Sequence, residues 1–149
     1  MIKSLSFLAA LTFGISSVAN GACEKGTKTV FSCLAASGKQ IQVCDSGKTI
    51  DYSFGKPGLP PEIIVRALRS EAYTIPWNGM GRYESYSVAV PNGNTTYDVF
   101  WSEDRITEGR PVSAGVNVQV SKKHVATVRC VGEKHIVQKI VDTDLKSIE

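Results

Sequence analysis

Residues 86–101 read YSVAVPNGNTTYDVFW, and this stretch decides the fold class. Apolar side chains alternate with small or polar ones on both sides of the Asn-Gly-Asn sequence at residues 92–94. A period of two turns one face of a strand toward a core and the other toward water, and Asn-Gly favours a tight turn. The stretch therefore predicts two strands joined by a turn at residues 92–94.

Six further runs predict strands of the same kind. Two alternate as regularly and four are less regular apolar runs: residues 50–54 and 116–120, then 29–34, 40–44, 62–68 and 125–130. Sequences rich in Gly, Pro, Ser and Lys separate the runs and indicate turns. About eight short strands at this close spacing predict an all-β fold, an antiparallel barrel or sandwich.

Two segments break the strand pattern. Residues 70–82 contain one proline and two glycines and predict a long loop. From His135 onward, apolar residues recur at helical spacing, which predicts a short amphipathic C-terminal helix lying against the barrel. A further strand over Ile136–Val141 is the alternative for this tail.

The N-terminal residues have the three-part pattern of a secretory signal peptide. Lys3 precedes an apolar run, and small residues then favour cleavage after Gly21. We therefore expect a signal peptide at residues 1–21 and one secreted β-domain at residues 22–149, in the periplasm or outside the cell. Removing 21 of 149 residues leaves 128, which suits a single core.

Cys23 lies directly after this segment, so a lipid anchor at Cys23 is the alternative to a free mature N-terminus. A lipid-modified cysteine usually follows an aliphatic residue three positions earlier, where this chain has Asn20. The mature part contains no second long apolar stretch, so we expect no transmembrane segment in it. Its charges are mildly basic and interspersed, which argues against a nucleic-acid partner.

All four cysteines lie in the predicted mature part, which indicates two disulfides in an exported chain of this size. With a three-residue loop at residues 37–39, Cys33 falls opposite Val43, and Cys44 then points to the other face. A two-residue loop would instead allow Cys33 to pair with Cys44. If the sheet closes, the first and last strands are neighbours, which predicts the pairs Cys33–Cys130 and Cys23–Cys44.

Patterns that carry catalysis are weak in this chain. The two histidines, His124 and His135, fall in a predicted turn and before the tail. No serine stands in a Gly-x-Ser-x-Gly elbow, no Cys-x-x-Cys pair is present, and the carboxylates are scattered. We therefore predict no catalytic residue, no metal ligand and no cofactor, so the protein is not expected to be an enzyme.

Surface recognition is the better-supported class. The loop at residues 75–83 carries Trp77, Arg82 and Tyr83 among glycines, and Trp, Tyr and Arg dominate binding hot spots. The alternative is that Trp77 folds back and plugs one end of the barrel. Phe100 points outward by parity and belongs either to an interface or beneath the C-terminal helix.

Short motifs resemble the periplasmic and membrane-bound inhibitors of c-type lysozyme, which are small exported β-barrels. They are Phe31-Ser32-Cys33, Ala126-Thr127-Val128-Arg129-Cys130 and Tyr97-Asp98-Val99-Phe100-Trp101-Ser102. That family inserts a Ser-Gly-x-x-Tyr loop into the lysozyme cleft, where this chain has Asn92-Gly93-Asn94-Thr95-Thr96-Tyr97. The chain also looks like small exported proteobacterial β-barrel proteins with a Phe-x-Cys start and a Tyr-x-Phe-Gly strand, here Tyr52-Ser53-Phe54-Gly55.

The resemblance implies a protein partner in the cell envelope or an incoming cell-wall hydrolase. Asn92, Asn94 and Tyr97 would then contact that partner, and Arg105 is the nearest candidate for the family's inhibitory basic residue. We accordingly predict a non-catalytic periplasmic binding protein, an inhibitor of a lysozyme or other cell-wall hydrolase that acts by loop insertion. A structural or assembly factor of the cell envelope is the first alternative, and a small secreted hydrolase is the second.

Overall fold

The computed structural model describes residues 23–149, so the predicted signal peptide at residues 1–21 lies outside the described residues. The described chain is all-β and contains ten strands with two short 3-10 turns near the C-terminus. The strands are β1 (Lys28–Ala35), β2 (Gln40–Asp45), β3 (Thr49–Gly55), β4 (Ile63–Leu68), β5 (Tyr73–Ile75), β6 (Tyr83–Asn92), β7 (Thr95–Asp104), β8 (Val112–Val120), β9 (Lys123–Val131) and β10 (Val137–Gln138).

The all-β antiparallel prediction is confirmed, and each of the eight predicted runs forms a strand. The sheet follows the order β4-β3-β2-β1-β9-β8-β7-β6-β5 and does not close into a ring between β4 and β5. The predicted loop at residues 70–82 contains β5, which the sequence analysis missed. Three residues are too few for an alternating pattern to show, and β5 is a strand because it pairs with β6.

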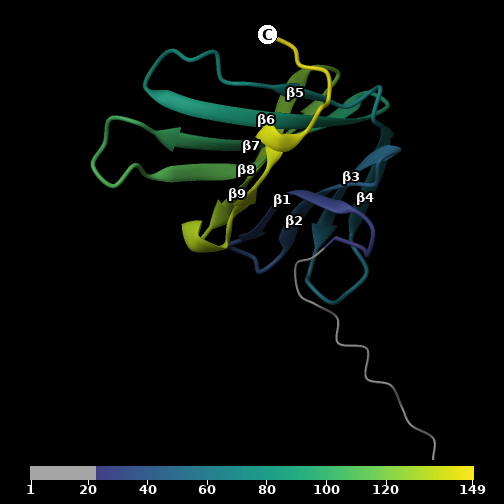
Figure 1. Ribbon diagram of the computed structural model, residues 1–149. Helices are drawn as coiled ribbons and strands as arrows, with labels where there is room; N and C mark the ends of the chain where they lie inside the picture. Colours follow the sequence, from purple (N-terminus) through teal and green to yellow (C-terminus); the bar gives the residue numbers. More distant parts are fainter. Residues whose placement is uncertain (1–22) are drawn as a thin grey trace, which may run out of the picture.

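The long sheet folds into two halves that enclose one core. Figure 1 shows β1 to β4 on one side and the longer strands β6, β7 and β8 on the other. Tyr52 of β3, Val88 of β6 and Val99 of β7 are fully buried in a shared apolar cluster. Tyr52 also stacks on Tyr97 with 4.5 Å between the ring centres, so the two halves meet directly.

The two halves join at a narrow seam between β1 and β9. Only Leu34 with Val131 and Ala35 with Cys130 pair across it. Earlier along β1, the same edge pairs with β10, and Phe31 lies opposite Gln138 there. The rest of β9, residues 123–129, therefore extends past the end of β1 and pairs only with β8 among the described strands.

The expected C-terminal amphipathic helix is not formed, because the tail is spread across several partners instead. It makes a 3-10 turn η1 (Glu133–His135), the strand β10, and a second 3-10 turn η2 (Ile140–Asp142). Ile140 and Leu145 reach the core from this tail. Ser147 then bridges to Thr74 of β5, so the tail connects the two halves of the sheet.

Both predicted disulfides, Cys33–Cys130 and Cys23–Cys44, are confirmed. The expected register was wrong, because Cys33 lies opposite Ile41 and not Val43. Ala35 pairs with Lys39, so the three-residue loop occupies residues 36–38 rather than 37–39. A one-residue change in loop position shifts strand pairing by two residues, and an even shift leaves every side chain on its face.

Candidate functional site

Two loops at one end of the molecule bring together most of the predicted recognition residues. Residues 76–82 lead from β5 into β6, and residues 105–111 lead from β7 into β8. Since β6 and β7 pair antiparallel along their full length, with Tyr83 opposite Asp104, these loops emerge side by side, at the left in Figure 1. We call residues 76–83 and 104–111 together the loop surface.

Trp77 and Arg105 hold the two loops against each other. The guanidinium of Arg105 lies 4.7 Å from the centre of the Trp77 ring, a cation–π geometry. Arg105 also donates a hydrogen bond to the backbone oxygen of Gly81 at 3.3 Å. The indole N–H of Trp77 donates to the backbone oxygen of Met80 at 2.8 Å. Trp77 is half-buried and lies outside the core cluster, so it organises the loop surface.

Asp104 stabilises the base of the loop surface by accepting several hydrogen bonds. Its carboxylate is buried and accepts hydrogen bonds from the Arg82 guanidinium at 2.6 to 3.1 Å. The backbone N–H groups of Ile106 and Thr107 and the Thr107 hydroxyl donate to the same carboxylate. The Arg82 hydrogen bond is the main reason that the pKa of Asp104 lies well below its usual range.

Apolar side chains stand out from this fixed base. Met80 and Ile106 are 72% and 73% exposed, and Tyr83 is 54% exposed. Arg82 lies over the Tyr83 ring with 5.5 Å to its centre. A loop that is hydrogen-bonded internally and still turns apolar groups to water is the kind of surface that partners cover.

The other predicted contact residues lie at the opposite end of the β6–β7 hairpin. Asn92 and Asn94 are exposed in its turn, and the Asn94 backbone oxygen accepts a hydrogen bond from Ser121. Tyr97 is committed to its stack on Tyr52. Ten-residue strands separate the two ends by roughly 30 Å, so the predicted residues divide into two groups and do not form one site.

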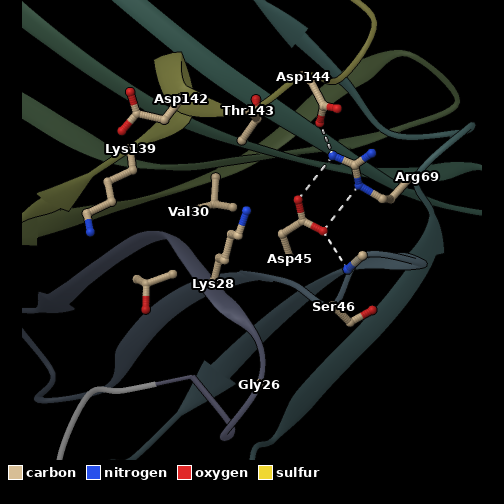
Figure 2. Close-up of a pocket in the computed structure, with 12 residues that line it drawn as sticks. Gly26, Lys28, Val30, Asp45, Ser46, Arg69, Lys139, Asp142, Thr143 and Asp144 are labelled. Atoms are coloured by element: carbon tan, nitrogen blue, oxygen red, sulfur yellow. Dashed lines mark hydrogen bonds and ion pairs between the residues drawn. The ribbon is translucent and has the colours of Figure 1, made fainter.

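A polar cleft of about 690 Å³ lies between the start of β1, the β2–β3 turn and the C-terminal tail. Figure 2 shows the guanidinium of Arg69 between the carboxylates of Asp45 and Asp144. Its shortest bond to Asp45 measures 3.1 Å, and the Arg69 hydrogen bond is the main reason that the pKa of Asp144 is lowered. Arg69 thereby fastens the tail to the β2–β3 turn.

The cleft also contains Lys28, Lys139 and Asp142, which line it from β1 and from the tail. Three cationic and three acidic side chains therefore face this space, and their formal charges cancel. These six residues were not predicted as a group. They come from four distant segments of the chain, and no local spacing marks them.

Asp98 is the described carboxyl group whose pKa is raised. It lies on the outer face of β7, between Ala89 of β6 and Asn117 of β8. Burial raises its pKa, and hydrogen bonds from Ser87 and Asn117 act in the opposite direction. Oδ1 of Asp98 is buried and has no hydrogen-bond partner among residues 23–149. This carboxyl is on the sheet surface and not in the polar cleft.

Phe100 points outward as parity predicted, and Arg129 of β9 lies over its ring, 6.0 Å from the centre. The C-terminal helix that was the alternative cover is not formed. Exposed Ile106 was missed as a site residue, although a single apolar residue amid the charged run at residues 103–110 is a detectable signal.

Comparison with protein-family models, curated proteins and solved structures finds no match to this chain. Within residues 23–149, no helix is long and apolar enough to cross a membrane. In the same range, no group of three or more His, Cys, Asp or Glu side chains is placed to hold a metal ion. Two disulfides suit a chain that folds in an oxidising compartment.

Proposed function

We propose that this protein is a non-catalytic binding protein that engages a protein partner through the loop surface. The observation that carries the proposal is the high exposure of Met80 and Ile106 on loops that the Trp77–Arg105 stack holds together. We further propose that the chain is exported after cleavage behind Gly21 and acts in the periplasm or outside the cell.

Preorganisation supports this function. The loops are already held by the Trp77–Arg105 stack and by the hydrogen bonds on Asp104. A partner would therefore not need to order them, and the entropy lost on association is reduced. Met80 and Ile106 would supply the apolar contact, while Arg105 would supply a positive charge beside it.

The partner proposed in finer terms is a lysozyme or other cell-wall hydrolase whose cleft carries catalytic carboxylates. Arg105 forms no ion pair with a carboxylate of the described chain, whereas Arg82 is bound to Asp104 and Arg110 to Glu103. Arg105 is therefore the arginine of the loop surface that is available for an acidic cleft. Loop insertion would place it there together with Ile106.

The test measures inhibition of c-, g- and i-type lysozymes by the oxidised protein, titrated to micromolar concentration. The double variant Met80→Ser/Ile106→Ser should lower the inhibitory affinity at least tenfold, because hot-spot truncation typically removes 2 kcal/mol or more. The matched control is Leu59→Ser/Ile64→Ser, which removes two apolar side chains that are 62% and 49% exposed elsewhere.

Equal inhibition by wild type and the Met80/Ile106 variant would contradict binding through the loop surface. Absence of inhibition by wild type would contradict the lysozyme-inhibitor proposal. Capture of envelope proteins on the wild type and on the same two double variants then tests the broader proposal. A partner retained equally by all three proteins would overturn it.

A second candidate function, a structural or assembly factor of the cell envelope, is favoured by one observation. The sheet is open, and residues 123–129 of β9 have an edge that no described strand covers. Exposed edges accept strands from other chains, and assembly factors use this mode of recognition.

A further inference from the structure

The hairpin formed by β8 and β9 ends in an exposed arm. We define the arm as residues 121–129, from the hairpin turn to the last residue before the β1 seam. Its residues from Ser121 to Thr127 are all exposed, and Val125 is 57% exposed. From Ala126 to Arg129 the pairing with β8 is regular, so four consecutive residues present an ordered free edge.

The arm carries positive charge without a counter-charge. No aspartate or glutamate occurs between Arg110 and Glu133, a stretch that contains Lys122, Lys123 and Arg129 as well as His124. The ion pairs of the described chain involve none of these four side chains.

The hydrogen bonds of the arm go to neutral groups. Arg129 donates to the Ser113 hydroxyl at 2.9 Å and lies over Phe100. His124 shares a hydrogen bond with the Thr127 hydroxyl at 2.7 Å. These contacts fix the direction of both side chains and leave the charge of Arg129 uncompensated.

Basic residues on an edge strand have two physical consequences. They oppose pairing with a second copy of the same edge, because both copies would bring positive charges to the shared edge. They favour a segment of opposite charge, since opposite charges across a strand pair are stabilising. The free edge of the arm therefore favours an acidic segment over a second copy of the same basic edge.

We propose that the free edge of the arm binds an extended acidic peptide segment of a partner protein by strand addition. Backbone hydrogen bonds to residues 126–129 would supply the pairing, and Lys122, Lys123 and Arg129 would select carboxylate side chains. The inference gives the second candidate function its partner chemistry. It does not depend on the loop surface.

The test uses three labelled eight-residue peptides and the folded, disulfide-bonded protein in low salt. The first alternates Glu with Val or Thr, the second replaces each Glu by Lys, and the third carries the Glu residues with two prolines at the apolar positions. The acidic peptide without proline should bind at least tenfold more tightly than either of the others, because only it combines charge with the ability to form a strand.

The double variant Lys122→Glu/Lys123→Glu should lower the affinity for the acidic peptide at least tenfold. Lys48→Glu/Lys56→Glu, on exposed turns elsewhere, makes the same change in net charge and should leave the affinity within twofold. Hydrogen exchange followed by NMR should show new protection on peptide binding at the amides within residues 126–129 that point away from β8.

Several results would overturn the proposal. Equal affinity for the acidic peptides with and without proline would show attraction by charge alone. Protection confined to other strands, or dimerisation of the protein through the arm, would assign the edge to a different occupant. Met80→Ser/Ile106→Ser should leave peptide binding unchanged, so this proposal and the one on the loop surface fail separately.

Discussion

The two disulfides should contribute unequally to stability, and the difference follows from the length of chain that each one closes. Cys33 and Cys130 are 97 residues apart, whereas Cys23 and Cys44 are 21 apart. In the chain-entropy model, loops of these lengths correspond to about 4.7 and about 3.3 kcal/mol, a difference of about 1.4 kcal/mol.

The native structure adds to this difference. Cys33 is 1% exposed, so its replacement by alanine leaves unfilled space in the core, whereas Cys23 and Cys44 are half-buried. Cys130 also lies in the β1–β9 seam, which rests on two residue pairs. We expect Cys33→Ala/Cys130→Ala to be less stable than Cys23→Ala/Cys44→Ala by at least about 1.4 kcal/mol.

Urea denaturation of the two double variants measures this difference. The midpoint of thermal unfolding should differ by about 5 °C or more for a domain of this size. The urea dependence of the unfolding free energy should also be steeper for Cys33→Ala/Cys130→Ala, because a long cross-linked loop keeps the unfolded chain compact. Equal stabilities, or a reversed order with unchanged urea dependence, would refute the reasoning.

Three further predictions follow from single positions. Gly115→Ala should lower the free energy of unfolding, measured by urea denaturation, by about 3 kcal/mol, because an added Cβ would lie 2.2 Å from the Val128 backbone oxygen. A loss below about 1 kcal/mol would contradict the β8–β9 register. Tyr97→Ala should lower the free energy of unfolding by about 2–4 kcal/mol, because the stack on Tyr52 is lost. An unchanged melting temperature would show that Tyr97 is not held by this stack and is available to contact a partner. Asp98→Asn should raise stability at pH 7 and not at pH 3. The folded protein holds the Asp98 proton more tightly than the unfolded chain, so ionisation above the usual pKa lowers stability; the same gain at both pH values would contradict this.

The strands could be predicted from the sequence wherever one face of the strand is exposed to solvent. Tyr97, Val99 and Trp101 alternate with outward side chains, and β7 was found from that pattern alone. The same parity correctly predicted both disulfides even though the loop position was off by one residue. The tail was misread because Ile140 and Leu145 belong to an apolar series at helical spacing, yet they reach the core from a 3-10 turn and from the irregular chain after it.

The candidate site was only partly accessible. Trp77 and Arg105 were recognised by residue type, yet nothing in their spacing shows that one stacks on the other, because β6 and β7 bring their loops together. Asn92 and Tyr83 were placed in one binding set, and the ten-residue strand between them puts them at opposite ends. Sequence distance says little about position once a chain folds back on itself.

The C-terminal tail connects the two halves of the sheet, so the molecule cannot reach its native state before the tail is present. Residues 137–148 complete the edge of β1, add Ile140 and Leu145 to the core and connect to β5. One edge of the first described strand pairs early with β2, but its other edge stays unpaired until nearly the whole chain has been synthesised and, for an exported chain, has crossed the membrane. Such distant contacts make folding slow. The unfinished domain would expose apolar strands during that interval, and a chaperone in its compartment would find a substrate there.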